Sequence, residues 1–375
     1  MISYDDALKK MKERERPMNC RIIAAQCVRS RTLCTLIVLV LAALLPTTQL
    51  NARELTDIFG GKVVVPDHIR KAYATSPPAT YMLYAIDPAV LAGLNTPVRK
   101  WEKRYLRKQI QRLPVLGGWY GQGYVPNIEM VLKVNPQIII VPSLHSAIDE
   151  RTNHTLKDVP IPAVSVKMDT LASYPDAFTT LGEALGRQRR AKKLSVYARK
   201  TAAQIARIVD TLPSDRRVSV YYAEGEDGLS TECGASMHVE LIELAGGLNV
   251  HRCASKTGYG MEKVSLEQVL LYNPDVILVF ERLFFKSILS DPRWRQIKAV
   301  REGKVYLIPR QPFNWFDRPP SFMRVLGLKW LTNLLHPELY PVDIVKETQS
   351  FYTLFLDVNL TRKEASAILY YRTPD

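Results

Sequence analysis

The sequence predicts an α/β protein made of two similar lobes joined by one long helix. A seventeen-residue segment occurs twice, at residues 125–141 and 263–279, and a long helical pattern lies between the two copies. Aligned at a constant offset of 138 residues, the copies share seven of their seventeen positions. Solenoid repeats have periods of about 20–50 residues, so this offset is too large for one. The repeat therefore indicates two separate lobes that contain the same unit.

Each copy has the pattern of a short helix, an Asn-Pro stop and a buried strand. Apolar side chains recur at helical spacing, as Ile128, Val131 and Leu132 in the first copy and Leu266, Val269 and Leu270 in the second. The Asn-Pro pairs at 135–136 and 273–274 end these helices, because proline disfavours helical geometry in the residue before it. The apolar runs 138–141 and 276–280 are continuous, which is typical of strands covered on both faces.

The segment 1–52 has the layout of a signal peptide. Basic residues precede an uncharged, almost wholly apolar run at 33–45, and Ala52 offers a cleavage point. A permanent transmembrane helix needs about 20 apolar residues, so this run is too short for one. An uncleaved anchor stays open because Leu50 is not small, and Met18 is an alternative start. We expect export to the periplasm, with the mature protein peripheral to the membrane.

The remaining 323 residues exceed a usual single core and predict two domains. We expect a first lobe at 53–170, which opens with two short extended pieces around Gly60-Gly61. A connecting backbone helix is expected within 171–213, and a second lobe at 214–375. Apolar residues keep steps of three or four from 188 to 213, which predicts one helix of about 35 Å at about 1.5 Å per residue. Such a helix would be a stiff spacer.

The chain is basic, with a formal net charge of +14, and +10 remains after residues 1–52 are removed. A basic exported protein suits an anionic ligand or a membrane surface, although a solvated basic surface explains the charge equally well. Nucleic acid is not an expected partner, because the basic residues are scattered and the chain carries an export signal. Cys233 and Cys253 remain after signal removal, and two such cysteines can pair in an oxidising compartment.

No enzyme is predicted. The chain has no G-x-S-x-G elbow, Walker loop or H-E-x-x-H motif. Asp227, Glu232 and His238 could act as acid–base partners, but an exposed polar loop explains them equally well. The histidines show no spacing of three or four residues and no dense metal motif, so neither a metal site nor a cofactor is predicted. They are His68, His145, His154, His238, His251 and His336.

Five segments in order carry a resemblance to a known family. They are GGKVVVPDHIRKAYATSPPATYML, NPQIIIV, MHVELIELAGGLNV, NPDVILV and SDPRWRQIKAVREGKVYLIP. From about Thr56 to the C-terminus, the chain resembles periplasmic substrate-binding proteins of ABC importers. It is most similar to the group with a rigid helical backbone that carries iron–siderophore complexes, haem or cobalamin. The resemblance implies the class III bilobed fold, with two Rossmann-like α/β lobes joined by the long helix.

The resemblance also implies a function and partners. A protein of this group captures a metal chelate in the cleft between its lobes and delivers it to a permease dimer that works with an ATPase. In the family, one glutamate on each lobe docks into arginine pockets of the permease, and these positions match Glu129 and Glu267. The ligand itself stays open. A molybdate or tungstate oxyanion, a bare metal ion, or a two-lobed sensor without a transport role are the alternatives.

Ligand contacts are expected in loops after the carboxyl ends of the strands, where open α/β sheets bind. The candidates are Trp119, Tyr120 and Tyr124 in GGWYGQGY, Tyr222 at a strand end, and Trp315, Phe316 and Arg318 in RQPFNWFDRPPS. In the vitamin B12-binding member of the family, a tryptophan at the position of Trp119 lines the pocket. Rings cover apolar area and guanidinium groups bind carboxylate or catecholate oxygens. Core or inter-lobe packing is the alternative for each ring.

Overall fold

The computed structural model describes most of the chain after its first 51 residues. The described ranges are 52–119, 124–143, 147–253 and 260–370. All described residues belong to one compact unit, which begins at Ala52. The expected signal peptide therefore lies outside the described residues except for Ala52. Within these ranges, no helix combines the length and apolar character needed to cross a membrane.

The first lobe is built on a parallel sheet. Its strands are, in order, β3 (Ala72–Ala74), β4 (Ile138–Ser143) and β5 (Ala163–Lys167). An antiparallel hairpin of β1 (Ala52–Thr56) and β2 (Lys62–Pro66) precedes it and confirms the two extended pieces predicted around the glycine pair. The helices of this lobe are α3 (Pro77–Ile86), α4 (Ile128–Val134) and α5 (Ala147–Leu156). Burial of all six β4 residues explains the continuous apolar run.

The second lobe is built on a four-stranded parallel sheet. Its order is β11 (Val305–Leu307), β10 (Val276–Val279), β6 (Val218–Ala223) and β8 (Gly247–Asn249). A small antiparallel pair is formed by β7 (Ser230–Thr231) and β9 (Glu262–Lys263). The helices around these strands are α8 (Glu240–Leu244), α9 (Leu266–Tyr272), α10 (Arg282–Ile288) and α11 (Lys298–Arg301).

The repeated segment folds in the same way in both lobes. It forms α4 followed by β4 in the first lobe, and α9 followed by β10 in the second. Each helix ends on an asparagine in the left-handed region, Asn135 at φ 49° and Asn273 at φ 40°. Asparagine tolerates this conformation better than most residues, and the proline that follows cannot continue the helix. The predicted helix–stop–strand unit is confirmed, with Val131 and Val269 as the buried residue of each helix.

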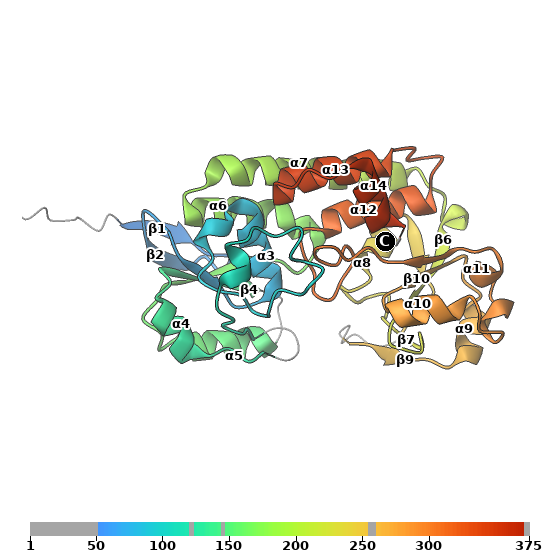
Figure 1. The fold of residues 1–375 in the computed structure, drawn as a ribbon, viewed down its shortest axis with the longest axis horizontal. Coiled ribbons are helices and arrows are strands. Elements are labelled where there is room, and N and C mark those ends of the chain that lie inside the picture. The colour runs from blue at the N-terminus through green and yellow to red at the C-terminus, as the bar shows by residue number, and fades with distance from the viewer. Residues whose placement is uncertain (1–51, 120–123, 144–146, 254–259, 371–375) are drawn as a thin grey trace, which may run out of the picture. The chain divides into compact units, whose positions relative to one another are not determined.

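The expected connecting segment contains two helices. They are α6 (Tyr174–Leu185) and α7 (Gln188–Asp210), separated by a turn at Gly186, which has φ +67°. α7 contacts α3 and α6 on the side of the first lobe, and α8 and α12 (Arg324–Leu335) on the side of the second (Figure 1). Its buried stripe, from Ala191 to Val209, repeats at the spacing that the sequence predicts. The long helix therefore joins the lobes as expected.

The C-terminal helices add a second connection between the lobes. They are α13 (Ile344–Leu356) and α14 (Arg362–Leu369). α13 packs on α3, and the ring of Tyr352 meets that of Tyr105 edge-on at 5.7 Å. Beyond the end of α13, Asp357 pairs with Arg107 at 2.8 Å. One continuous cluster of buried side chains includes residues of both sheets and of α7, α12 and α13. Relative motion of the lobes is restricted by this shared core as well as by α7.

Candidate functional site

The carboxyl ends of three parallel strands meet at one edge of the second sheet. The N–H of Phe280 donates to the carbonyl of Ala223 (2.9 Å), and the N–H of Ile308 donates to the carbonyl of Val279 (3.0 Å). The segments that follow β6, β10 and β11 are therefore neighbours. The longest of them is the loop Arg310–Ser321, which carries three of the residues predicted to bind the ligand. This edge is where an open α/β sheet binds ligands.

The loop Arg310–Ser321 is fixed by its own hydrogen bonds and by a close helix contact. The N–H of Trp315 donates to the carbonyl of Pro309 (3.0 Å). The side-chain oxygen of Asn314 accepts from the backbone N–H groups two and three residues further on (2.7 and 3.0 Å). Gly327 in α12 lies so close to the carbonyl of Trp315 that a Cβ there would collide with it. The loop therefore has a defined shape rather than that of a loose surface segment.

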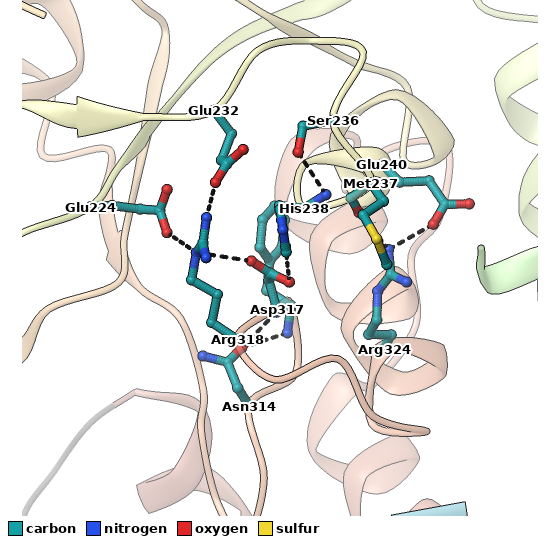
Figure 2. Close-up of polar contacts among 11 residues, drawn as sticks. Glu224, Glu232, Ser236, Met237, His238, Glu240, Asn314, Asp317, Arg318 and Arg324 are labelled. Atoms are coloured by element: carbon teal, nitrogen blue, oxygen red, sulfur yellow. Dashed lines mark hydrogen bonds and ion pairs between the residues drawn. The ribbon is translucent and has the colours of Figure 1, made fainter. Parts of the chain in front are cut away.

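A group of titratable side chains gathers around Arg318 (Figure 2). We name it the Arg318 cluster; its members are Glu224, Glu232, His238, Asp317 and Arg318. Arg318 Nε donates to Glu224 Oε1 (2.6 Å), and Arg318 Nη2 donates to Glu232 Oε1. Arg318 Nε also lies 3.4 Å from Asp317 Oδ2. The other oxygen of Asp317 is 2.7 Å from Nδ1 of His238. Three carboxylates thus share one guanidinium and one imidazole.

The carboxylates of the Arg318 cluster are almost completely buried. The side chains of Glu224, Glu232 and Asp317 are 1%, 0% and 1% exposed, whereas that of Arg318 is 26% exposed. Among the described residues, Glu224 Oε2 and Glu232 Oε2 have no hydrogen-bond partner. Burial raises the pKa of Glu224 because it disfavours the charged form; Asp317 raises it further, and the charge of Arg318 opposes both. The cluster therefore holds a surplus of buried negative charge.

A second ion pair, between Arg324 and Glu240, lies near the Arg318 cluster (Figure 2). Arg324 in α12 is 1% exposed and donates through Nη2 to Glu240 Oε2 (2.7 Å) and to the carbonyl of Met237 (3.2 Å). Glu240 also accepts from the N–H of Leu171 (3.1 Å), which precedes α6. The guanidinium lies 5.9 Å from the ring centre of Tyr174. This pair links the second lobe to the segment that leads into the backbone helices.

Three arginines from both lobes lie near enough to this edge for their charges to influence one another. Arg310 follows β11, Arg282 begins α10, and Arg99 lies in a first-lobe loop with its guanidinium 5.4 Å from the ring of Trp101. Burial lowers the pKa of Arg310, the charge of Glu281 opposes this shift, and the charges of Arg99 and Arg282 lower the pKa further. Arg310 Nη1 donates to the carbonyl of Phe280 (3.4 Å). No carboxylate of the described residues forms an ion pair with Arg310. Clustered guanidinium groups of this kind attract an anion.

The two lobes touch at this edge. Phe313 stacks on Tyr81 of α3, with ring centres 3.7 Å apart and ring planes 19° apart. The hydroxyl of Tyr105 donates to Gln311 Oε1 (3.0 Å). Both contacts join the loop Arg310–Ser321 to the first lobe. The space beside the stacked rings is a cavity of about 30 Å³.

Gly118 and Trp119, in the described part of the glycine-rich segment GGWYGQGY, lie at the end of β3. The N–H of Trp119 donates to the carbonyl of Thr75 (3.0 Å), and a Cβ at Gly118 would lie 2.6 Å from the same oxygen. The side chain of Trp119 is half-buried against the core of its own lobe. Tyr124 is 48% exposed. Tyr120 lies outside the described residues, so its predicted ligand contact has no structural counterpart here.

Three of the aromatic residues predicted to bind the ligand lie in the interior. Tyr222, Trp315 and Phe316 are 0%, 0% and 1% exposed, and the rings of Tyr222 and Phe316 lie 4.9 Å apart. These rings have no exposed face in this structure, so they pack in the core below the carboxyl edge of the sheet. Trp315 and Phe316 belong to a loop in which ligand contacts are expected, and they are buried because Gly327 lets this loop lie directly on α12. Arg318 has exposed surface but is engaged by carboxylates.

Two members of the cluster lie in segments predicted to contact the ligand but are not themselves among the predicted residues, and two others had an open interpretation. Glu224 and Asp317 are not predicted as site residues. The interpretation as part of an exposed polar loop is correct for Asp227, which forms an ion pair with Lys263 at 3.1 Å on the surface. It does not hold for Glu232, which is fully buried. His238 is also mostly buried, with 16% of its side chain exposed. One feature of the sequence could have pointed to the cluster. Asp317 and Arg318 are adjacent charged residues of opposite sign, and they lie between aromatic residues and two prolines.

The pair of cysteines closes a loop that carries His238 and directly follows Glu232. Cys233 and Cys253 form a disulfide with their Cα atoms 5.5 Å apart. Cys233 is buried and directly follows Glu232, whose carbonyl accepts from Asn249 Nδ2 (2.9 Å). The two cysteines are separated by 20 positions in the sequence.

Among the described residues, no group of three His, Cys, Asp or Glu side chains is arranged to hold a metal ion.

The two glutamates with a predicted docking role occupy equivalent positions. Glu129 and Glu267 are each the second residue of a helix, and both are exposed. The preceding caps, Asn127 and Ser265, accept from the backbone N–H groups of the third residues at 2.9 and 3.2 Å. A carboxylate in the first turn of a helix is favoured by the helix dipole. The docking role itself stays a prediction.

A family model for periplasmic binding proteins matches residues 120–312, which is more than half of the chain. The chain belongs to this family. A solved ABC transporter solute binding protein from Sulfurospirillum deleyianum DSM 6946 is 38% identical, covers 84% of this chain and 98% of that chain, and has a TM-score of 0.80. Molybdate-binding protein MolA of Haemophilus influenzae is 27% identical over 346 residues, which are 84% of this chain and 95% of that protein. Fe(3+)-citrate-binding protein YfmC of Bacillus subtilis is 24% identical over 199 residues, 51% of this chain and 59% of that protein.

Membership of the periplasmic binding protein family establishes the general function. The fold is the class III bilobed fold of this family, and the protein is an ABC-type solute-binding protein. The relatives are transport components rather than enzymes, which fits the expectation of no catalysis at the level of the family. A permease and its ATPase are the kind of partner that such a component has, and the family is periplasmic or exported. The ligand is not fixed by family membership.

Proposed function

We propose that the protein captures a small anion, an oxyanion of the molybdate class, between its lobes and delivers it to an ABC permease. The observation that carries this proposal is the nearness of Arg99, Arg282 and Arg310, which come from both lobes. Arg310 has no ion-pair partner among the described residues. Like charges brought together by two lobes repel one another, and an anion placed between them removes that repulsion. The anion would therefore stabilise the closed arrangement of the lobes.

The chemistry of guanidinium groups suits this ligand. They present planar sets of N–H donors that bind oxyanions with charge-assisted hydrogen bonds. The net charge of +10 after residues 1–52 would also steer an anion toward the protein. The end of β3 is a poorer anion site, because Pro77 and Pro78 begin α3 and supply no N–H groups at its N-terminus. The arginines are thus the better candidates for binding an anion.

The contact between the lobes and the burial of the predicted aromatic residues favour an oxyanion over a large chelate. The stacking of Phe313 on Tyr81 brings the lobes into direct contact at the edge. The burial of Tyr222, Trp315 and Phe316 removes rings that would have covered the apolar surface of haem or cobalamin. MolA, which matches over most of both chains, is named for molybdate. A small anionic metal chelate is the second candidate, because the relative YfmC is named for ferric citrate.

The delivery step rests on the two exposed glutamates. Glu129 and Glu267 start equivalent helices of the two lobes, so one docking contact on each lobe could bind a permease dimer. Replacement of these residues is not expected to alter ligand affinity, since neither belongs to the edge that carries the arginines.

Isothermal titration calorimetry of residues 53–375 tests the ligand. The panel holds molybdate, tungstate, sulfate, ferric citrate, a ferric catecholate siderophore, haem, cobalamin and Ni²⁺. We expect binding of molybdate or tungstate, and a loss of about 10- to 100-fold in affinity for Arg99→Gln, because one charge-assisted hydrogen bond contributes about 1.5–3 kcal/mol. Lys100→Gln is the matched control and should bind normally. Arg310→Gln should weaken binding as well.

Each other result changes the conclusion. Binding of ferric citrate alone would move the assignment to an anionic chelate. Binding of haem or cobalamin, unaffected by Arg99→Gln, would overturn the small-anion proposal. Binding of Ni²⁺ alone would require ligands other than the arginines. A complete lack of binding would favour an exported sensor.

A further inference from the structure

The buried acids beside the arginines have a consequence for binding. We propose that the site takes up its anion together with a proton, which is held by the Arg318 cluster. This inference rests on the proposed anion-binding function and adds a second, co-bound ligand to it. The surplus negative charge of the cluster has no other evident use in a protein that binds an anion. A proton is the smallest cation that can offset it.

The charges of the cluster do not balance. Three carboxylates share one guanidinium, so two negative charges remain when the imidazole of His238 is neutral. Arg324 reaches toward Asp317 from α12, but its charge is matched by Glu240 of α8. The hydroxyls of Tyr174 and Tyr222 also face this region from α6 and β6. An unbalanced charge in a dry interior is costly, so the cluster favours gaining a proton.

The cluster has places for that proton. Glu224 Oε2 and Glu232 Oε2 are buried and unpaired among the described residues, so either oxygen can accept a proton without breaking a hydrogen bond. Burial and the neighbouring Asp317 already raise the pKa of Glu224. His238 offers a second position, because its Nδ1 is 2.7 Å from Asp317 Oδ1 and an imidazolium there would complete an ion pair. The geometry and the charges thus point to the same groups.

Arg310 lies beside the strand end that carries Glu224. Its Nη1 donates to the carbonyl of Phe280 (3.4 Å). The N–H of Phe280 donates in turn to the carbonyl of Ala223 (2.9 Å), the residue that precedes Glu224. An anion bound at Arg310 therefore adds negative charge close to carboxylates that already repel one another. The proton affinity of the cluster rises when the anion binds, and by reciprocity the anion binds more tightly when the proton is present.

The direction of the pH dependence follows. Anion affinity should be highest at low pH and fall as the cluster loses its proton. Where one proton is taken up with the anion, the affinity falls by up to about tenfold per pH unit. A pH range of 5.5 to 8.5 keeps molybdate mostly in its fully ionised form. Sulfate, which stays doubly charged throughout this range, separates protonation of the protein from that of the ligand if it also binds.

The test is calorimetry of residues 53–375 with molybdate at about pH 6.5 in two buffers of different ionisation enthalpy. The difference in measured heat gives the number of protons taken up, and we expect between about one half and one per anion. Glu224→Gln removes one negative charge and keeps an oxygen for Arg318 Nε. This variant should take up fewer protons and bind molybdate about tenfold more tightly than wild type at pH 8.5. Glu226→Gln, an exposed neighbour on the same loop, is the control and should match wild type.

The outcomes separate the two proposals. Anion binding without proton uptake, and with the same affinity at pH 5.5 and 8.5, would overturn the proton inference and leave the proposed function standing. Failure of any anion to bind would overturn both. Equal proton uptake by Glu224→Gln and wild type would move the proton from Glu224 to another member, and His238→Gln would then have to abolish uptake. If neither variant changed it, the Arg318 cluster would be excluded as the proton site.

Discussion

Replacing Arg318 with methionine removes the guanidinium that three buried carboxylates share. Methionine keeps most of the aliphatic side chain, so the change is largely one of charge. The side chains of Glu224, Glu232 and Asp317 are at most 1% exposed, so water cannot take the place of the lost partner. Breaking a buried pair by removing one partner costs about 3–5 kcal/mol. We expect the free energy of unfolding of Arg318→Met to fall by about this amount at pH 8.

A surface pair with similar geometry provides the control. Arg199 in α7 lies 2.8 Å from Asp176 in α6, but these side chains are 64% and 80% exposed. Water and salt screen such a pair, and its contribution is about 0–1 kcal/mol. Arg199→Met should therefore change the free energy of unfolding by no more than about 1 kcal/mol. The contrast between the two variants isolates burial as the cause, since both lose one guanidinium.

The loss of unfolding free energy caused by Arg318→Met should be smaller at acidic pH. Burial raises the pKa of Glu224 in the folded protein, so folding binds a proton more strongly there than the unfolded chain does. A group of this kind contributes stability at low pH, and the contribution is lost as the pH rises through its folded pKa. Removing Arg318 takes away the charge that opposes this shift. The difference in the free energy of unfolding between Arg318→Met and wild type should therefore be larger at pH 8 than at pH 5.

Urea unfolding followed by far-UV circular dichroism measures these differences. The double variant Arg318→Met with Glu232→Gln should regain part of the lost stability, because one unpaired charge is gone. A loss of less than about 1 kcal/mol for Arg318→Met would refute the assignment of a strongly coupled buried cluster. A defect of equal size at pH 5 and pH 8 would refute the role given to Glu224.

Three further predictions concern the disulfide, the glycine-rich loop and docking. Replacing Cys233 and Cys253 with serine should lower the free energy of unfolding by about 2–4 kcal/mol, and thermal unfolding with and without reductant measures this; an unchanged transition would reject a structural role. Gly118→Ala places a Cβ 2.6 Å from a strand-end carbonyl oxygen, so the loop must move and the free energy of unfolding should fall, which urea unfolding measures; an unchanged transition would show that the loop adjusts freely. Replacing Glu129 and Glu267 together with glutamine should leave anion affinity intact and abolish uptake in cells, and a fall in affinity would argue against docking.

The repeated unit could be predicted because its folding is local. A helical stripe, an asparagine and a proline determine where the helix ends, and the following apolar run can only be a buried strand. Asn135 and Asn273 both adopt the left-handed cap that this pattern favours. The second connection between the lobes could not be predicted in this way. It depends on contacts such as that between Tyr105 and Tyr352, which are far apart in the sequence.

The Arg318 cluster could not be predicted because its members come from separate segments. Arg318 lies 94 residues after Glu224 and 86 after Glu232. Each of these residues, taken alone, has the character of an exposed loop residue, since charged side chains are rarely buried unless they are paired. Only the parallel order of β6, β10 and β11 brings the segments to one edge. The same order buried the aromatic residues that the sequence had suggested for ligand contact.

Two arginines of one loop have different roles because their partners differ. Arg318 uses Nε and Nη2 on buried carboxylates, which leaves little capacity for an external anion. Arg310 donates to a backbone carbonyl and has no ion-pair partner among the described residues, so its positive charge is offset only in part, by the nearby charge of Glu281. Arg310→Gln should therefore weaken anion binding at every pH. Arg318→Met should instead alter stability and the pH dependence of binding, because it changes the charge against which the anion binds. A sequence comparison would treat these arginines as equivalent, whereas their carboxylate neighbours distinguish them.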